Sequence, residues 1–255
     1  MTTPEVLCFV SHVPKGMVPV PGGTCFLSGQ HEGVCVASFA ISKYAVTLGE
    51  WKSVCASMKE NGYDIGKRAT GSAEDHPVHS VNWHDALKWC NAKSEMLGLT
   101  PVYATKGIPY RRGEKVPAVV GSANGFRLPT QTEWEWAASG GRQSKGFAYS
   151  GSNKIGEVAW YSATSIGAAV DMSKGHGTWP VAQKAANELG LYDMTGNVWE
   201  WCRDAWGSSR MIRGGGWADS ADTCALSCRR DIPPAHRFYD IGFRPVCAWD
   251  ETCAQ

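Results

Sequence analysis

Two cysteines near the C-terminus have the residue type and spacing to bind a soft metal. Cys224 and Cys228 have three residues between them, and paired thiolates are ligands that Cu(I) prefers. A structural zinc site is not indicated, because the ten cysteines include no repeated CxxC pair. His76 and His79, in the segment HPVH, form the one close pair of histidines.

The same end of the chain holds a run of residues suited to binding rather than to packing. Ala218 to Asp240 shows neither a helical nor a strand period and mixes acidic, basic and aromatic residues. Unpaired charges are seldom buried, whereas Tyr, Arg, Asp and His supply adaptable contacts at exposed interfaces. Gly214 to Trp217 precede the run and Ile241 to Arg244 follow it. We therefore expect a surface segment held outward by a rigid frame.

Helices and short strands are predicted to form this frame. Helices are expected over 47–58, 82–98 and 133–138, with Thr47, Asn82 and a Thr130–Glu133 capping box at their starts. A hairpin is expected over 17–29 with its turn at Gly22-Gly23, two extended segments within 34–46, and strands at 102–103 and 198–199. Ala86, Leu87, Cys90 and Met96 or Leu97 form the expected buried stripe of the second helix. Residues 59–79 and 145–190 are expected to be irregular.

Composition excludes some functions and leaves others open. The 255 residues include 29 glycines and 12 tryptophans, which favours one loop-rich domain over 1–255. A net charge of +1 gives no reason to expect nucleic acid or an anionic membrane as a partner. The sequence contains no run of eighteen apolar residues. The start MTTPEVLCFV does not have the pattern of a signal peptide.

Six blocks in order give the chain a family resemblance. They are MVPVPGGTCFLSG (17–29), ISKYAVTLGEW (41–51), GFRLPTQTEWEWAASGG (125–141), GLYDMTGNVWEW (190–201), RGGGW (213–217) and IGFRPV (241–246). Together they resemble the formylglycine-generating-enzyme, or sulfatase-modifying-factor, family over nearly the whole chain. The resemblance implies an α+β fold, the C-type lectin fold of this subtype. Two main helices, small twisted antiparallel sheets and much irregular structure are expected.

The enzyme chemistry of that family is not expected here. Its oxidases carry a copper-binding pair of cysteines with four residues between them, and the matching positions are Asp219 and Cys224. The first cysteine is therefore missing, and a non-enzymatic protein is expected. A copper-dependent cysteine oxidase using Cys224 and Cys228 in another register stays open as the alternative. Another branch adds an iron-binding histidine domain, which has no counterpart in this sequence, so we expect His76 and His79 to be structural or to lie on the surface.

A third branch of the family fits the run at 218–240. It resembles the variable region of proteins diversified by a diversity-generating retroelement, in which adenines of a template are replaced, chiefly in AAC codons. Trp, Met, Lys, Glu and Gln cannot arise in that way, and all five are absent from this run. The resemblance gives Trp217, Arg229, Pro234 and Arg237 as fixed positions. The variable, ligand-binding positions are then Ala218, Asp219, Ser220, Asp222, Cys228, Arg230, Asp231, Ile232, Pro233, Ala235, His236, Phe238, Tyr239 and Asp240.

Diversification sets a physical requirement on these positions. A core substitution commonly costs about 2–5 kcal/mol, whereas an exposed one usually costs within about 0.5 kcal/mol. The variable side chains must therefore point into solvent, while Trp217, Leu226, Ile241 and Phe243 are expected to anchor the segment inward. Arg244 is expected either to pair internally with Glu133 or Glu135, or to lie on the surface.

These expectations define the hypotheses. The leading one is a ligand-binding, receptor-like or adhesin-like protein, with a shallow surface for an unknown protein or other macromolecule. A monomer is expected, and the resemblance implies a cell-surface, outer-membrane lipoprotein. A plain structural or adhesive domain without diversification also stays open.

No cofactor is required by this reading, but the resemblance implies one possible ion. The family holds a structural calcium through a glutamate and neighbouring carbonyl groups, which map to Glu200 with Thr195, Gly196 and Val198. The alternative is a glutamate bonded to backbone amides or to an arginine.

Overall fold

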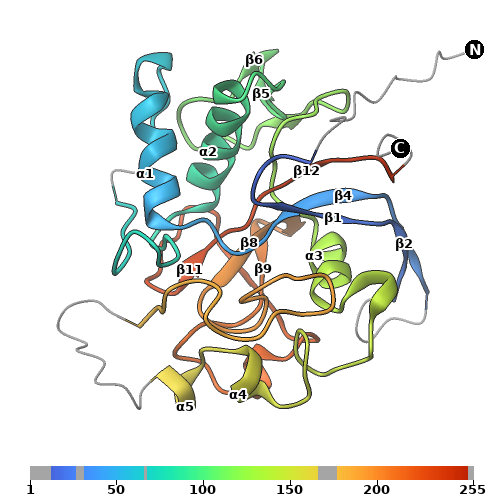
Figure 1. Ribbon diagram of the computed structural model, residues 1–255. Helices are drawn as coiled ribbons and strands as arrows, with labels where there is room; N and C mark the ends of the chain where they lie inside the picture. Colours follow the sequence, from blue (N-terminus) through green and yellow to red (C-terminus); the bar gives the residue numbers. More distant parts are fainter. Residues whose placement is uncertain (1–12, 27–31, 66–67, 166–176, 252–255) are drawn as a thin grey trace, which may run out of the picture.

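The computed structural model describes residues 13–26, 32–65, 68–165 and 177–251 (Figure 1). The N-terminal decapeptide, Cys8, Cys253 and the end of the expected hairpin at Leu27 lie outside these ranges. The helices are α1 (Leu48–Ser57), η1 (Lys59–Asn61), α2 (Trp83–Met96), α3 (Gln131–Ala138), η2 (Gly141–Gln143), α4 (Ile155–Val158), α5 (Ser162–Ser165) and η4 (Asp222–Cys224). Within the described ranges, no helix is long and apolar enough to cross a membrane.

The strands form small sheets, as expected for the α+β class. They are β1 (Met17–Val20), β2 (Gly23–Cys25), β3 (Val34–Val36), β4 (Phe39–Ser42), β5 (Tyr103–Thr105), β6 (Ile108–Pro109), β7 (Ala118–Val119), β8 (Trp199–Trp206), β9 (Ser209–Arg213), β10 (Arg229–Ile232), β11 (Ile241–Gly242) and β12 (Val246–Ala248). The sheet orders are β1-β4-β12, β10-β9-β8-β11, β2-β3 and β6-β5-β7. All pairs are antiparallel except β8–β11, which is parallel and departs from the all-antiparallel expectation.

The predicted helices are confirmed, and so are their caps. The side chain of Asn82 accepts a hydrogen bond from the backbone N–H of Asp85 at 2.9 Å, at the start of α2. Thr47 caps α1 in the same way. Thr130 and Glu133 form both halves of the capping box at α3, which begins two residues before the predicted start. Local hydrogen bonding therefore fixes where each helix starts.

The predicted hairpin over 17–29 is wrong. β1 pairs with β4, with Val20 opposite Phe39, and β2 pairs with β3. Neither glycine of the pair adopts a positive φ, so no tight hairpin turn forms there. Space explains the glycines instead: a Cβ on Gly22 would lie 2.5 Å from the backbone oxygen of Val36, and one on Gly23 would lie 2.6 Å from the ring of Trp136.

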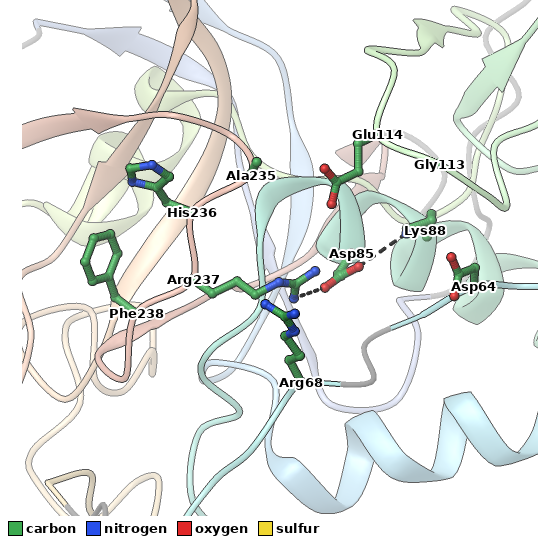
Figure 2. A pocket seen from close by; sticks show the side chains of 10 residues that line it. All are labelled: Asp64, Arg68, Asp85, Lys88, Gly113, Glu114, Ala235, His236, Arg237 and Phe238. Atoms are coloured by element: carbon green, nitrogen blue, oxygen red, sulfur yellow. Dashed lines mark hydrogen bonds and ion pairs between the residues drawn. The ribbon is translucent and has the colours of Figure 1, made fainter.

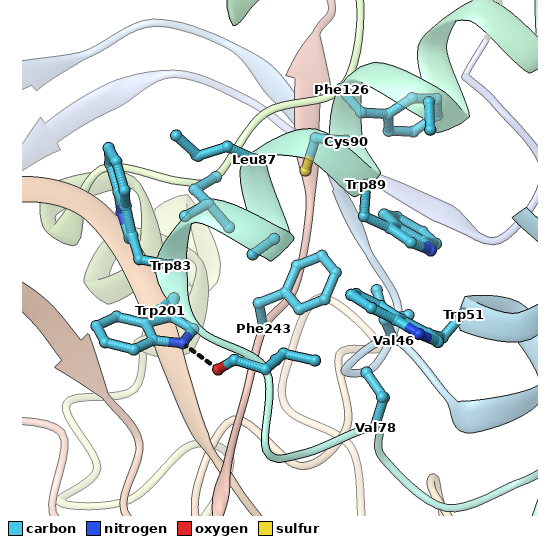
Figure 3. Packing of buried hydrophobic residues seen from close by; sticks show 14 of the residues in the cluster. Val46, Trp51, Val78, Trp83, Leu87, Trp89, Cys90, Phe126, Trp201 and Phe243 are labelled. Carbon is cyan, nitrogen blue, oxygen red and sulfur yellow. Dashed lines mark hydrogen bonds between the residues drawn. The ribbon is translucent and has the colours of Figure 1, made fainter. Parts of the chain in front are cut away.

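An aromatic core lies between the two long helices and the β8–β9 sheet. In Figure 1, α1 and α2 lie side by side, and Figure 3 shows the rings between them and β8. Trp51 and Trp89 stack with ring centroids 6.3 Å apart, and Phe243 meets Trp89 edge-on at 5.3 Å. The expected stripe of α2 is buried at Ala86, Leu87 and Cys90. Leu97, which follows the end of α2, is 49% exposed.

Candidate ligand-binding surface and the pocket beneath it

Buried residues hold both ends of the segment predicted to vary. Trp217 is 5% exposed and Ile241 is 3% exposed, and Leu226 and Phe243 are also buried, so all four predicted anchors point inward. The chain enters through Gly215, whose φ is +75° and whose added Cβ would lie 2.5 Å from the sulfur of Cys224. A side chain at this position would be both strained and overpacked.

The exposure predicted for the segment is found at most positions, and their part in binding stays a prediction. The exposed residues are Ala218, Ser220, Asp222, Arg230, Asp231, Pro233, Ala235, His236, Phe238 and Tyr239. The four half-buried ones are Asp219, Cys228, Ile232 and Asp240. For those four, the expectation that every variable side chain points freely into solvent is wrong.

The half-buried positions have structural contacts that explain the difference. The carboxylate of Asp219 accepts hydrogen bonds from Trp199 Nε1 at 2.7 Å and from the backbone N–H of Gly216 at 2.9 Å. Cys228 and Ile232 pack against the main hydrophobic core. Ile232 belongs to β10, a strand that the sequence pattern did not predict, which pairs with β9. Substitution at these positions therefore disturbs packing or hydrogen bonds as well as the surface.

Main-chain groups fix the path of the segment's second half. The backbone N–H of Trp83 donates to the carbonyl of Pro234 at 3.0 Å, and that of Ser80 donates to the carbonyl of Phe238 at 2.9 Å. The backbone N–H of Trp199 donates to the carbonyl of Asp240 at 2.7 Å. Any residue supplies a carbonyl group, so these contacts hold whatever side chain stands at Phe238 or Asp240.

One buried side-chain contact fixes the same stretch. Arg237, a position predicted to be constant, forms an ion pair with Asp85 of α2, whose side chain is 3% exposed. The same arginine donates to the carbonyl of Ser80 at 3.3 Å. Removing the arginine would leave Asp85 with one cationic partner fewer in a desolvated place. A constant residue at 237 is therefore what a stable loop requires.

The exposed aromatic residues are partly ordered by their neighbours. Phe238 is 42% exposed and Tyr239 is 55% exposed. The ring of Tyr239 lies 5.7 Å from that of the buried Trp217, and the ring of Phe238 lies 5.8 Å from that of His236. Rigid aromatic area at low entropy cost is the chemistry that protein-binding surfaces use.

A pocket of about 670 Å³ opens beside this surface (Figure 2). Its lining joins α2 and two loops to the segment predicted to vary, and consists of Asp64, Arg68, Asp85, Lys88, Gly113, Glu114, Ala235, His236, Arg237 and Phe238. None of the lining residues outside the segment predicted to vary was expected from the sequence to be functional. Asp85 and Lys88 did give a signal, since both are charges on a helix whose neighbouring residues are apolar.

The cysteine pair has the properties of packed thiols. Cys224 is 1% exposed, and burial raises the pKa of its thiol to about 12. Burial also raises the pKa of Cys228. Metals bind the thiolate form, so these environments do not favour copper. The position of the missing cysteine, Asp219, is occupied by the hydrogen-bonded carboxylate described above.

The histidine pair serves the local structure. His79 is 3% exposed, and His76 Nδ1 lies 3.1 Å from Thr178 Oγ1. Nowhere in the described ranges do three or more His, Cys, Asp or Glu side chains gather as a metal site would need.

Arg244 is buried, but its predicted partners were wrong. It pairs with Glu200 at 2.8 Å rather than with Glu133 or Glu135, and those two acids pair with Arg127 and Arg213. The carboxylate of Glu200 also accepts from Trp134 Nε1 at 2.7 Å.

These contacts bear on the expected calcium site. Thr195, Gly196 and Val198 are buried beside Glu200, yet both oxygens of Glu200 already have donors. The side-chain oxygen of Thr195 accepts from the backbone N–H of Ser150 at 3.0 Å. The bonds of Glu200 favour the alternative of a glutamate bonded to an arginine, and the calcium site itself stays a prediction.

The fold and this surface define a loop-rich α+β scaffold with a C-terminal segment displayed on it. A model of the sulfatase-modifying factor enzyme 1-like domain matches residues 10–249. The chain therefore belongs to the sulfatase-modifying-factor family, as its six sequence blocks predicted.

Several relatives and solved structures resemble the chain. The chaperone protein LppX of Paenibacillus barcinonensis is 37% identical over 84% of this chain and 83% of its own length. The inactive C-alpha-formylglycine-generating enzyme 2 of Bos taurus is 36% identical over 67% of this chain and 50% of its own length. Variable protein 1 of Treponema denticola superposes with a TM-score of 0.72 at 31% identity, covering 91% of this chain and 94% of its own. The crystal structure of CarF gives a TM-score of 0.78 at 29% identity, covering 94% and 100%.

The Arg244–Glu200 pair gives a stability prediction. Arg244→Met leaves Glu200 as a buried charge without its cation, so we expect a loss on the order of 3–5 kcal/mol in urea unfolding. The double variant with Glu200→Gln is expected to recover part of the loss, because it removes the bare charge. Excess chelator is expected to leave the unfolding midpoint of the unaltered protein unchanged. A lowered midpoint in chelator would restore the calcium hypothesis.

Asp240 gives a pH prediction. Burial, with the nearby Asp219 carboxylate, raises the pKa of Asp240 from 3.8 to about 6. A raised carboxyl pKa stabilises the fold at low pH, and this contribution is lost as the pH rises from about 4 through 6. Asp240→Asn stays neutral, so we expect it to raise the melting temperature relative to the unaltered protein at pH 8 but not at pH 4. Asp222→Asn, an exposed acid, is the matched control. An equal effect of Asp240→Asn at both pH values would contradict the assignment.

Proposed function

We propose that this domain is a non-enzymatic binding protein that displays changeable side chains on a fixed scaffold. One observation carries the proposal: the backbone of residues 233–240 is held by carbonyl groups and by Arg237, while the side chains of Ala235, His236, Phe238 and Tyr239 are exposed. Such a segment can change its side chains at little cost in stability. The surface has exposed aromatic area with charges around it, as protein-binding surfaces do.

The comparisons support this proposal from two directions. A relative is named as an inactive member of the enzyme family, and a structural neighbour covering most of the chain is named as a variable protein. The finer claim, that a retroelement diversifies this segment, rests on the missing residue types in 218–240. A surface-exposed lipoprotein is the location that we propose with it.

The oxidase alternative is disfavoured by the buried environment of the two cysteines. Copper chemistry would need Cys224 and Cys228 as thiolates, and burial raises the pKa of both thiols. A plain scaffold without diversification is separated from the proposal by the gene test that follows.

The neighbouring DNA tests diversification directly. We expect a near-identical repeat with adenines at the variable codons, beside a reverse transcriptase gene, and sister copies that differ within codons 218–240. Differences are expected to be most frequent at the exposed positions and rarer at Asp219, Cys228 and Ile232, because those side chains have structural contacts. Sister copies that differ chiefly elsewhere in the gene would contradict the proposal.

Stability measurements test whether the aromatic residues are free to change. The double variant Phe238→Ala with Tyr239→Ala is expected to lose only about 0.5–1 kcal/mol, because both residues are exposed and neither belongs to the core. It should also abolish binding to a ligand once one is identified. The matched control is Ile241→Ala at the buried end of the segment, with an expected loss of about 2–5 kcal/mol. Equal losses in urea unfolding would place the aromatic rings in the core and end the proposal.

A further inference from the structure

The pocket beside the variable segment has an excess of cations at its floor. The carboxylate of Asp85 lies between two of them: its Oδ1 is 3.2 Å from Lys88 Nζ, and its Oδ2 pairs with Arg237. The side chains of Asp85 and Lys88 are 3% and 4% exposed. In Figure 2 the guanidinium groups of Arg68 and Arg237 both point toward Asp85. One buried carboxylate is therefore shared by two cations, Lys88 and Arg237.

Of the two cations that pair with Asp85, Lys88 has the fewer partners for its charge. An ammonium group has three donors, and Lys88 Nζ has no other hydrogen-bond or ion-pair contact to the described residues than Asp85. Removing an ammonium from water costs several kcal/mol unless partners replace the water. Lys88 lines the pocket, so an anion entering there would supply the missing acceptor.

Two acids on the remaining walls limit which anion fits. Asp64 and Glu114 line the pocket and are exposed, and Glu114 accepts from Asn82 Nδ2 at 2.8 Å. A dianionic phosphate would be repelled by these carboxylates as well as by Asp85. A single carboxylate adds only one negative charge, and it pairs well with lysine and arginine donors.

We propose that the pocket receives an acidic side chain of a peptide segment in the protein ligand, held by Lys88 and Arg68. The inference rests on the proposed function, because His236 and Phe238 of the variable segment form one wall of the pocket. Residues flanking the acidic side chain would contact that wall. The volume of about 670 Å³ is enough for one side chain and parts of its neighbours.

The residues at the floor of the pocket are predicted to be constant, whereas those of the wall are predicted to vary. Asp85 and Lys88 lie outside the variable segment, and Arg237 is one of its predicted constant positions. The wall residues Ala235, His236 and Phe238 are predicted to vary. The same carboxylate anchor would therefore persist while the wall changes, and sister copies would share a preference for acidic ligands but differ in what surrounds the acid.

Backbone amide NMR with two capped peptides tests the anchor. Acetyl-Ala-Glu-Ala-amide at millimolar concentration is expected to shift the amide signals of Lys88, Ala235 and His236, and acetyl-Ala-Gln-Ala-amide, which lacks the charge, is expected to shift none of them. Shifts with acetyl-Ala-Lys-Ala-amide in place of the glutamate peptide would overturn the proposal, since the pocket would then select cations through Asp64 and Glu114. Shifts confined to residues outside the pocket would overturn it as well.

Peptide binding by substituted proteins shows whether the floor residues or the wall residues hold the glutamate. Lys88→Met is expected to weaken glutamate-peptide binding by about tenfold or more, because it removes a buried, charge-assisted bond. Arg68→Gln, at an exposed residue whose change leaves the core intact, is expected to weaken it severalfold even if Lys88→Met fails to fold. Arg229→Gln, an exposed arginine outside the pocket lining, is the matched control and should bind as the unaltered protein does. His236→Ala with Phe238→Ala should keep the binding, since the floor is unchanged.

The outcomes also distinguish this inference from the proposed function. Unchanged binding in both Lys88→Met and Arg68→Gln would overturn the carboxylate anchor, while diversification in sister copies would still support the proposed function. Sister copies that differ outside codons 218–240 would contradict the proposed function. The wall residues would then be as constant as the floor residues.

Discussion

The ion pair between Arg237 and the buried carboxylate of Asp85 is the interaction on which the display surface depends. A buried carboxylate is tolerable only with partners, and Asp85 takes one of its partners from the displayed segment itself. The helix α2 therefore holds the loop by a charge that cannot be left bare. In return, Arg237 of the loop supplies a positive charge to Asp85 in the first turn of α2. This contact lets one side chain fix the position of its exposed neighbours.

The rest of the loop is held by groups that every residue has. Carbonyl oxygens of Pro234, Phe238 and Asp240 accept from N–H groups of the scaffold, so the backbone keeps its path without help from most of its side chains. The segment is not uniformly free, however. Asp219 is tied to Trp199 and Gly216, and Cys228 and Ile232 pack on the core. The surface therefore grades from freely exposed side chains to side chains that also support the fold, and a ligand would meet both kinds.

The exposed segment 218–240 contains the positions at which an enzyme of the same family would have its cysteine pair. Here the matching positions are a hydrogen-bonded aspartate, Asp219, and a buried thiol, Cys224, whose pKa burial raises to about 12. The scaffold that surrounds them is otherwise intact, with an aromatic core and capped helices.

The sequence by itself determined the family, the helix starts and the inward anchors, because these depend on local hydrogen bonding, side-chain size and the order of short blocks. It placed Thr47, Asn82 and Thr130 correctly as caps. Only the tertiary structure decided how strands pair, which acid meets Arg244, and that a charged pocket lies beside residues 235–238. Each of these joins residues far apart in the chain, such as Lys88 and His236. Their distance is set by the packing of the whole core, which no local pattern encodes.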